Sequence, residues 1–581
     1  MDQPSDGSVL LHVAGRRRWL LFSEPVATLY AYTPADVLPL LTEVAQAVAR
    51  RSLHAAGFVS YEAAPAFDAA LRTRVADDFP LAWFGLYDPP AEVASPVAEA
   101  GAVVPVDWQP SVSTAVYREA LRRIRDYIAA GDTYQVNYTL RLRAPVCPDP
   151  WLLFRRMVRS QGPGYAAWMS LPRWTIGSAS PEVFFAQDGE RIECRPMKGT
   201  AARGLWSGQD HDRSRWLGRS RKNRAENVMI VDMVRNDLGR IATPGSVCVP
   251  RLFEVERYPT VWQMTSTVSA VTRAPLPEVL AALFPAASIT GAPKVRTMEL
   301  IAELEDSPRR IYTGTLGYLA PGGQAQFNVA IRTVLTDRHT GAAEYGVGGG
   351  IVWDSRAPAE ADECRIKARV LTQDSAEFSL IETLLWTPGE GYALLERHLS
   401  RLADSAGYFG FPCALAAVRR RLAEGVSGFA AVPQRVRIAL EATGVLTFEA
   451  VPLKPLPTPW RVGLARSPVS SGDRFLYHKT TVRRVYQEAL AGGPGLDDVL
   501  LWNERRELTE SCIANLVVEL DGEWVTPPVR CGLLPGTCRA ELLATGQARE
   551  RVVRIADLSR CTRVRLANSV RGVWDVEVVK D

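Results

Sequence analysis

The chain has 581 residues, of which 47% are hydrophobic and 23% are charged. This composition is ordinary for a globular protein and argues against a disordered chain, while the length is sufficient for two or more domains. The net charge of +4 is too small to indicate a nucleic-acid partner. The sequence shows neither a signal peptide nor a long apolar run, so we expect a cytoplasmic protein without a membrane segment.

The numbers and settings of the lysines and cysteines limit the kinds of catalytic or metal site that the chain can carry. Only 7 of the 68 basic residues are lysines, so a lysine inside a motif is less expected by chance. The nine cysteines contain no C-x-x-C pair, which argues against a zinc site or a disulfide framework. None lies in the G-x-C-x-G setting of a glutamine-amidotransferase nucleophile. We therefore expect ordinary buried thiols.

In chain order, the first clear helical pattern covers residues 113–130, where apolar residues recur at four-residue spacing and Gly131 follows as a cap. A second covers residues 356–371, and there Glu360, Glu363 and Lys367 share one face. Many short β-branched runs alternate with such stretches, so we expect a mixed α/β (α+β) protein. The proline-rich residues 452–459 predict an extended connector.

Three segments of the first half are acidic or rich in glycine: residues 224–238, 346–351 and 359–363. Carboxylates on separate elements could hold Mg²⁺, which takes few protein ligands. The backbone N–H groups of a glycine run could approach an anion closely. The same acids could equally be surface charges and the glycines a strand bulge, and periodicity alone favours this plainer interpretation.

Five segments taken together, in one order, resemble the chorismate-utilising enzymes, a family that includes anthranilate, aminodeoxychorismate, isochorismate and salicylate synthases. They are residues 131–137, 195–200, 226–238, 288–294 and 346–367. The resemblance spans residues 1–372 and implies large β-sheets flanked by helices. It also implies that Glu226 and Glu363 bind Mg²⁺ directly and that Glu360 assists through water. Asn223 departs from the family, because many relatives have a fourth acid there.

The same resemblance implies a pocket for chorismate, which carries two carboxylates. The residues it assigns to this pocket are Gln135, Gln263, Ser288, Tyr312, Arg332, Gly348, Gly349, Gly350 and Lys367. Of these, Tyr312, Arg332 and the glycine backbone are expected to hold the pyruvyl carboxylate. A metal, an arginine and a group of N–H donors can together neutralise two carboxylates.

Two positions distinguish the members of this family. Isochorismate and salicylate synthases carry a lysine base where this chain has Gln135, and a glutamine cannot take a proton from water. Lys198 stands where anthranilate synthases usually have alanine, and in this it resembles aminodeoxychorismate synthases. The resemblance implies that this lysine attacks ring C2 and that ammonia then enters at C4. Gln263 agrees, because anthranilate synthases commonly have histidine there.

The second half begins after a short linker, residues 373–378, and contains an isolated lysine, an isolated glutamate and a Gly-Thr pair before a helical stretch. These are Lys479, Glu510, Gly536 and Thr537. A pyridoxal-phosphate enzyme needs such groups for its imine, its ring nitrogen and its phosphate. Each piece is weak alone, but residues 379–581 together resemble the two-lobed class IV pyridoxal-phosphate family, with a D-amino-acid-aminotransferase-like fold.

That resemblance implies the role of each residue. Lys479 would form the Schiff base, Glu510 would hold the ring nitrogen, and Arg401 would bind the phosphate with Gly536, Thr537 and Ser569. Thr383 is a candidate proton donor. Two departures stand out: the segment that usually opens the small lobe is short, and Arg506 occupies a position where a turn glycine is common.

The two resemblances fit one another chemically, since the first half would make the substrate that the second half cleaves. We therefore expect chorismate and ammonia to become 4-amino-4-deoxychorismate and then 4-aminobenzoate plus pyruvate. We expect a separate glutamine amidotransferase to supply the ammonia, and a homodimer through the second domain remains open. Three alternatives remain: an anthranilate-synthase-like first half, an amino-acid aminotransferase as second half, or a non-catalytic docking module there.

Overall fold

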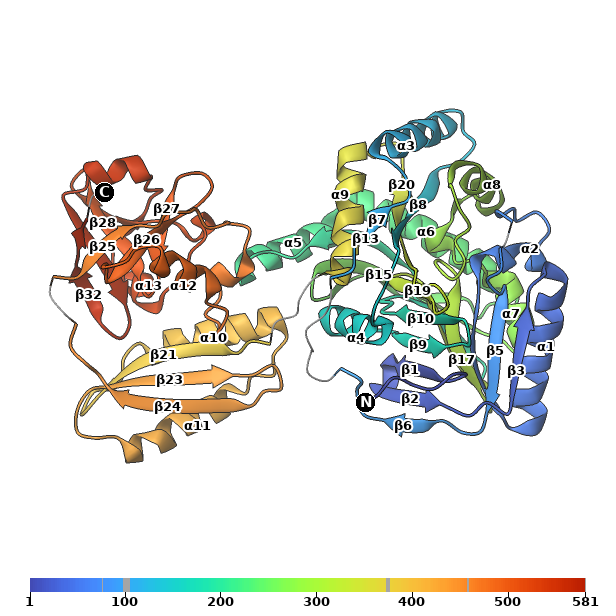
Figure 1. Cartoon of the computed structure of the whole chain (residues 1–581), viewed down its shortest axis with the longest axis horizontal. Helices are drawn as coiled ribbons and strands as arrows, with labels where there is room; N and C mark the ends of the chain where they lie inside the picture. The colour runs from blue at the N-terminus through green and yellow to red at the C-terminus, as the bar shows by residue number, and fades with distance from the viewer. Residues whose placement is uncertain (76, 98–104, 373–376, 457–458, 580–581) are drawn as a thin grey trace. The chain divides into compact units, whose positions relative to one another are not determined.

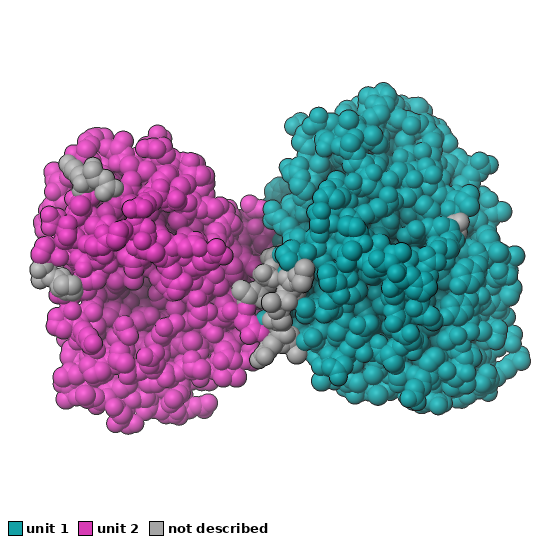
Figure 2. All heavy atoms as spheres, viewed as in Figure 1, with its two compact units in different colours: residues 1–202, 214–375 teal, residues 203–213, 376–581 magenta. Residues whose placement is uncertain are grey.

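The computed structural model describes the whole chain except residues 76, 98–104, 373–376, 457–458 and 580–581 (Figure 1). Contacts divide the chain into two compact units, which Figure 2 colours separately. The first comprises residues 1–202 and 214–375, and the second comprises residues 203–213 and 376–581. Most of the predicted linker, residues 373–376, lies outside the described residues. The units differ from the predicted division at residues 203–213, which come from the first half but belong to the second unit.

Two ten-stranded sheets form the centre of the first unit. The first contains, in spatial order, β16 (Gly291–Ala292), β8 (Gln135–Ala144), β20 (Ala343–Ile351), β19 (Thr333–Asp337), β10 (Trp174–Ser178), β9 (Ala167–Ser170), β1 (Val9–Val13), β2 (Arg18–Phe22) and β6 (Ala91–Val93), with β7 (Gln109–Pro110) paired to β8. The second contains β13 (Met197–Ala202), β15 (Val261–Val271), β12 (Arg191–Cys194), β11 (Val183–Asp188), β18 (Gln324–Val329), β17 (Thr315–Ala320), β4 (His54–Val59), β5 (Ala82–Tyr87) and β3 (Ala27–Ala31), with β14 (Cys248–Arg257) paired to β15.

The two sheets pack face to face, because one buried apolar cluster draws residues from both. Strand β4 shows how the sequence achieves this. Successive side chains of a strand point to opposite faces. Ala56 and Phe58 therefore join the cluster between the sheets, while Ala55 and Val59 join the cluster beneath the helices. With both faces buried, such strands are almost continuously apolar.

Helices cover the outer faces of both sheets, so the first unit has four layers. On the second sheet lie α1 (Pro34–Arg51), α2 (Ala64–Phe67), α6 (Arg221–Gly239) and α7 (Leu276–Leu283). On the first sheet lie α3 (Thr114–Ala129), α4 (Pro150–Gln161) and α9 (Ala357–Ala368), and α8 (Lys294–Leu304) contributes to both clusters. The two predicted helices are confirmed as α3 and α9, and Gly131 has the left-handed φ of +82° expected after a helix end.

The second unit consists of a small and a large lobe. The small lobe has β22 (Gly391–Tyr392), β21 (Leu380–Thr387), β23 (Gln434–Leu440) and β24 (Leu446–Pro452), packed against α10 (Leu395–Phe409) and α11 (Leu415–Gly425). The sheet of the large lobe has β30 (Arg549–Glu550), β29 (Glu523–Thr526), β28 (Asn515–Leu520), β27 (Leu508–Ser511), β26 (Asp498–Trp502), β25 (Arg461–Leu464), β33 (Glu577–Val578), β31 (Arg563–Asn568) and β32 (Gly572–Asp575). Helices α12 (Arg484–Ala491) and α13 (Thr537–Ala544) complete it. Arg506 has a φ of +58°, a conformation that explains why glycine is common at such a turn.

Residues 203–213 join the second unit through a short excursion of the chain. The excursion leaves the first unit at the end of β13 and continues into α5 (Ser207–Arg219), which begins in the second unit and ends in the first. Leu205 and Trp206 pack against the apolar cluster that contains Tyr477 and Val499. Helix α6 follows directly, so the excursion connects β13 to α6.

Two further expectations concern the whole chain. Among the described residues, no helix combines the length and the apolar character that crossing a membrane requires. All nine cysteines are free, and six of them are buried as predicted. Cys248 is exposed, so the prediction of buried thiols is wrong for that residue.

Candidate functional sites

A cavity of about 450 Å³ lies in the first unit. Most residues predicted for the metal, the nucleophile and the substrate line it: Lys198, Glu226, Gln263, Ser288, Tyr312, Arg332, Gly348, Gly350, Glu360, Glu363 and Lys367. Gln135 and Gly349 lie just behind this lining. Five segments that are far apart in the sequence therefore meet at one cavity.

The glycine run of β20 is shaped by its neighbours in this cavity. A Cβ on Gly350 would lie 2.6 Å from Gln135 Nε2 and 3.2 Å from Lys198 Nζ, and a Cβ on Gly346 would lie 2.1 Å from the Tyr312 ring. Only glycine permits such close approach. Strand β20 pairs with β8 in one unbroken register from Ala343 to Ile351, so the strand-bulge interpretation of these glycines is wrong.

Gln135 is buried on β8 and turns its amide toward Gly350. Neither its Nε2 nor its Oε1 has a hydrogen-bond partner among the described residues. Buried polar atoms are normally paired, so an unpaired amide beside a cavity indicates a ligand contact. The amide can donate and accept a hydrogen bond, but it cannot act as a base at neutral pH.

Lys198 lies on β13, half-buried in the cavity wall. Burial lowers the pKa of its amine, although the nearby carboxylate of Glu226 opposes this shift. A lowered pKa increases the neutral, nucleophilic fraction of the amine. The strand is held by pairing with β15, where Thr200 lies opposite Gln263 and donates from Oγ1 to Gln263 Oε1 at 2.9 Å.

Three carboxylates face the same cavity from two helices, Glu226 from α6 and Glu360 and Glu363 from α9. Burial raises the pKa of Glu226 and Glu360, and the other carboxylates contribute to both shifts. Burial also acts on Glu363, but the Lys367 ammonium at 2.7 Å outweighs it and the pKa is lowered. The structure therefore gathers negative charge that a cation can neutralise.

These carboxylates suit Mg²⁺ in their chemistry, since it prefers oxygen ligands. Two of them face lysines here, Glu363 paired with Lys367 and Glu226 lying 3.9 Å from Lys222. Among the described residues, no group of three acid, histidine or cysteine side chains converges closely enough to hold a metal ion. A metal ion at this site would therefore compete with Lys367 and Lys222 for these carboxylates.

Glu182 is a candidate functional residue that the sequence did not reveal. It lines the cavity, is only 4% exposed, and accepts a hydrogen bond from Ser288 Oγ at 2.6 Å. Burial raises its pKa to about 7, against the opposing effects of Ser288 and the Lys198 ammonium. A carboxyl with this pKa can donate a proton near neutral pH. Its short segment, Ser180-Pro181-Glu182, carries no motif, so only burial identifies it.

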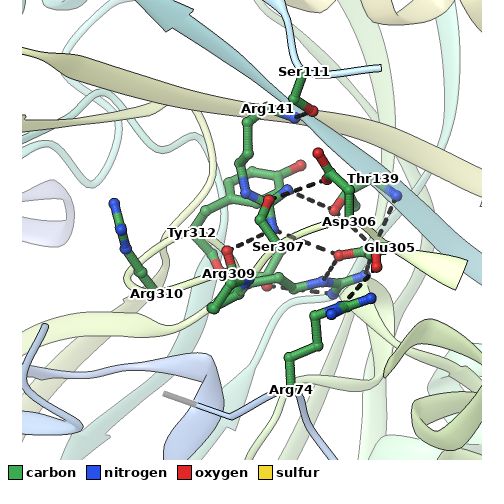
Figure 3. A network of polar contacts seen from close by, with 12 residues as sticks. Arg74, Ser111, Thr139, Arg141, Glu305, Asp306, Ser307, Arg309, Arg310 and Tyr312 are labelled. Carbon is green, nitrogen blue, oxygen red and sulfur yellow. Dashed lines mark hydrogen bonds and ion pairs between the residues drawn. The ribbon is translucent and has the colours of Figure 1, made fainter. Parts of the chain in front are cut away.

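A buried charge network fixes the loop that carries Tyr312 (Figure 3). The Glu305 carboxylate accepts bonds from Arg309 at 2.6 and 3.0 Å, and it also accepts from the Thr139 backbone N–H at 2.9 Å. The Arg141 guanidinium lies 5.2 Å from the centre of the Tyr312 ring. Breaking such a buried network leaves an unpaired charge, which is strongly unfavourable. Tyr312 is thus held rigidly between this network and Gly346.

Arg332 lies in the cavity wall with an unusual backbone. Its φ of +51° is left-handed, which costs a non-glycine residue about 1–2 kcal/mol. Its guanidinium is buried and donates to the Gln161 side-chain oxygen. Burial lowers the pKa of Arg332, but a guanidinium remains charged. Strain retained at a buried cation is typical of a functional residue.

Lys479 is the centre of a second site, in the second unit. It follows η6 (Arg474–Leu476), and its carbonyl accepts from the Ile381 N–H at 2.9 Å, which joins it to the strand that carries Thr383. Burial lowers the pKa of Lys479 to about 8, and the Arg401 cation contributes to the shift. A substantial fraction of its amine is therefore uncharged near neutral pH.

Glu510 is buried on β27 and is held by three hydrogen bonds. Tyr486 Oη donates at 2.8 Å, Asn515 Nδ2 at 3.1 Å and the Leu534 backbone N–H at 3.1 Å. Burial nevertheless raises its pKa to about 7. A carboxyl so oriented can share a proton with a basic ring nitrogen.

Arg401 lies on α10 within a buried network. It donates to both oxygens of Glu382 at 2.8 and 2.6 Å, and His398 Nδ1 lies 2.6 Å from the same carboxylate. Burial opposes ionisation of Glu382, but Arg401 and His398 prevail and bring its pKa to about 2. His398 Nε2 in turn lies 3.3 Å from Thr537 Oγ1, which connects Arg401 to the start of α13.

The remaining predicted residues surround the same region. Gly536 precedes α13, and a Cβ there would lie 1.8 Å from Asn515 Oδ1, so no larger residue fits. Ser569 Oγ donates to the Thr383 carbonyl at 3.3 Å. These contacts connect β21, β28, α13 and the end of β31, with free N–H groups at a helix start suited to an anion. A lysine with a lowered pKa, a buried carboxyl and a helix start are groups of the kinds that pyridoxal phosphate needs.

Comparison with known proteins gives two family matches. Residues 6–373 match the family described as chorismate binding enzyme, and residues 379–579 match the one described as amino-transferase class IV. The chain is 41% identical over 274 residues to aminodeoxychorismate synthase component 1 of Escherichia coli, covering 46% of this chain and 59% of that protein. It is 40% identical over 268 residues to anthranilate synthase component 1 of Thermus thermophilus, covering 45% and 57%.

The chain thus spans little more than half the length of the curated relatives it matches, and their similar identities do not distinguish the two kinds of synthase. Anthranilate synthase component I from Streptococcus pneumoniae superposes with a TM-score of 0.53 at 22% identity, over 64% of this chain and 94% of that one. This likeness shows the fold, which is the mixed α/β architecture with large sheets described above. The chain therefore belongs to the chorismate binding enzyme family and carries a class IV aminotransferase domain, whose family implies pyridoxal phosphate.

Proposed function

We propose that the chain catalyses two successive reactions, the amination of chorismate at C4 and the release of pyruvate from the product to give 4-aminobenzoate. The observation that carries this proposal is a pair of lysines, Lys198 and Lys479, one in each unit and both with a pKa lowered by burial. Each lies among the acids that its reaction needs. Such perturbed groups are typical of catalytic sites.

In the first reaction Lys198 Nζ attacks ring C2 of chorismate, the double bonds shift, and the C4 hydroxyl leaves. Glu182 is the candidate to protonate this hydroxyl, because it lines the cavity and its pKa of about 7 keeps it partly protonated at neutral pH. Ammonia then forms a bond to C4, the double bonds shift back, and the C2–Nζ bond breaks. The ammonium formed at C4 loses a proton to Glu182, now a carboxylate.

The substrate is held by the other residues of the cavity. Arg332 and the glycine N–H groups of β20 support binding of one carboxylate. The unpaired amide of Gln135 is a further candidate contact. If Mg²⁺ binds, Glu226 and Glu363 would hold it with Glu360 nearby, and it would neutralise the second carboxylate. Because Gln135 cannot activate water, addition of water at C2 lacks the lysine base that isochorismate and salicylate synthases carry at this position.

In the second reaction Lys479 has two tasks. Its Nζ would hold pyridoxal phosphate, and, once free of it, the same Nζ would take the C4 proton of the substrate. The cofactor would act as an electron sink, Glu510 would keep its ring nitrogen protonated, and Arg401 and Thr537 are the candidates to bind its phosphate. The enolpyruvyl group then leaves from C3 and the ring becomes aromatic. Thr383 is a candidate donor of the proton that the leaving group needs.

Ammonia would come from a separate glutamine amidotransferase. No cysteine of this chain lies in the sequence setting of such an enzyme's nucleophile. The name of the synthase relatives, component 1, supports the existence of a second component. Ammonium salts alone should therefore support turnover, whereas glutamine should require the added partner.

Product identification tests the proposal. The purified protein is incubated with chorismate, Mg²⁺, ammonium and pyridoxal phosphate, and we expect 4-aminobenzoate and pyruvate in equal amounts. Anthranilate would show that the first half is an anthranilate synthase. Accumulation of aminodeoxychorismate without pyruvate would favour a docking module, and exchange of the amine with an amino acid would favour an aminotransferase.

A further inference from the structure

Residues 203–213 separate, in the sequence, two stretches of the chain that line the cavity of the first unit. Lys198 lies on the strand before them, and Glu226 lies on the helix after them. Both residues line that cavity. The intervening residues 203–213 nevertheless belong to the second unit. The excursion therefore lies in the sequence between the proposed nucleophile and a predicted metal ligand, both of which belong to the first unit.

The segment is internally braced. Arg203 and Asp210 form an ion pair with an N–O distance of 2.7 Å, and both side chains are only 7% exposed. Asp210 Oδ1 also accepts from the Gly204 backbone N–H at 2.8 Å. A buried, hydrogen-bonded pair of this kind fixes a local conformation. The segment is thus a defined structure and can transmit a displacement.

Its first contact in the second unit is with α10, the helix that carries Arg401. Arg203 Nη2 donates to the Tyr408 carbonyl at 2.8 Å, and the Tyr408 hydroxyl donates to the Gly204 carbonyl at 2.7 Å. Ser207 Oγ donates to the Asp404 carbonyl at 3.2 Å. These bonds run in both directions, so the segment and α10 are fixed to one another.

Its second contact is with the two residues before Lys479. The Trp206 ring stacks on Tyr477 with 5.2 Å between ring centres. His478 Nε2 lies 3.2 Å from the Leu205 carbonyl, and its Nδ1 lies 2.9 Å from Ser405 Oγ. Burial lowers the pKa of His478 to about 4, so the ring is neutral at physiological pH. These partners assign the tautomer, with Nε2–H donating to Leu205 and Nδ1 accepting from Ser405.

We propose that residues 203–213 are a positioning element for Lys479, and that through them a ligand bound beside Lys198 changes the surroundings of Lys479. The proposal rests on the proposed function of Lys479 as the cofactor lysine. Only residues 199–202 separate Lys198 from the segment, and they lie on a strand that pairs with β15. Lys198 and Leu205 are therefore only seven residues apart in the sequence.

Hydrogen exchange of the full-length protein tests this coupling without any cofactor. Chorismate and Mg²⁺ are added with no ammonia, so no amine product forms for the second unit to bind. We expect exchange of the amides of residues 476–481 to slow by about fivefold, the lower end of usual couplings between sites. Glu363→Gln should abolish the response, because it weakens the first cavity alone. A response that survives in this variant would show that chorismate acts directly on the second unit.

Trp206→Ala should remove the response, since it removes the stack on Tyr477. Trp460→Ala is the matched control, because Trp460 also packs on an aromatic ring of the second unit, in its case edge-to-face on Trp574. Should Trp206→Ala fail to fold, Tyr408→Phe removes only the hydroxyl that bonds Gly204 and should weaken the response. An unchanged response in the folded segment variants, or none in the wild type, would overturn the proposal.

The holoenzyme gives a second readout. On chorismate binding without ammonia, the absorbance of the lysine-bound cofactor should shift in the wild type and not in Trp206→Ala. If no such absorbance develops in any variant, the proposed role of Lys479 fails, while the exchange experiment still decides the positioning proposal. If the absorbance develops but does not respond, only the positioning proposal fails.

Discussion

Replacing Glu182 by glutamine tests the step that the structure adds to the sequence-based mechanism. The two side chains have the same shape, and a glutamine oxygen can still accept the 2.6 Å hydrogen bond from Ser288. The amide has no proton to give to the leaving C4 hydroxyl. General acid catalysis typically contributes about 10²–10⁴-fold. We therefore expect the amination rate to fall by that factor, which equals about 3–5 kcal/mol in the barrier.

The pH profile should change as well. With a pKa of about 7, the protonated fraction of Glu182 falls from about one half at pH 7 to about one tenth at pH 8. The wild-type amination rate should therefore decline on the alkaline side, and the residual rate of Glu182→Gln should lose this decline. The assay follows chorismate consumption by chromatography at a fixed concentration of free ammonia. Fixing it prevents the titration of ammonium from imitating the effect.

Stability provides an independent check with a definite sign. Because the folded-state pKa of Glu182 is raised, its contribution to stability is present below about pH 4.5 and is lost as the pH rises to about 7. A shift of this size corresponds to about 3 kcal/mol. The free energy of unfolding of Glu182→Gln, minus that of the wild type, should therefore be larger at about pH 8 than at about pH 4. Thermal unfolding at the two pH values measures this.

Glu62→Gln is the matched control for both effects. Glu62 is also 4% exposed and its pKa is also raised to about 7 by burial, but it contacts the backbone N–H groups of Arg309 and Arg310 and does not line the cavity. Glu62→Gln should show the same pH-dependent difference in stability from the wild type. Its amination rate should still decline on the alkaline side. A Glu182→Gln enzyme that aminates chorismate at the wild-type rate would refute the assignment of Glu182 as the acid.

Three further variants separate the two reactions. Lys198→Ala should abolish formation of aminodeoxychorismate, measured by chromatography, and an unchanged rate would remove the covalent step. Glu363→Gln should lower amination and its response to Mg²⁺ while supplied aminodeoxychorismate is still cleaved; loss of both activities would contradict two independent sites. Lys479→Ala should accumulate aminodeoxychorismate and lose the absorbance of the bound cofactor, and 4-aminobenzoate formed at the original rate would exclude this lysine as the base.

The sequence predicts much of the first site, because its motifs combine residue types with a strict order. Gly348 and Gly350 show why: glycine is needed wherever β20 approaches another chain segment closely, and that need is visible in the sequence. The family match over residues 6–373 and the mixed α/β fold agree with the resemblance read from those motifs. The roles of the individual residues remain predictions, which the variants above can test.

Other features depend on tertiary contacts and leave no local signature. Glu182 is an ordinary glutamate until the fold buries it against Ser288. The apolar spacing predicted to form the buried face of α3 includes Val116, which is 52% exposed. Tyr117 and Leu121 are buried instead, because the helix packs on a face centred one residue further along the chain. Residues 203–213 follow a family motif directly, and no pattern in them shows that they join the other unit.

The excursion through residues 203–213 also bears on how such a fusion can evolve. Domains joined by one linker can be separated by a single cut in the gene, and each can then be exchanged or lost. Here a cut near residue 376 would remove Leu205 and Trp206 from the apolar cluster around Tyr477, and it would leave the Leu205 partner of His478 on the other product. The two halves are therefore not interchangeable modules, and selection on either one constrains the other.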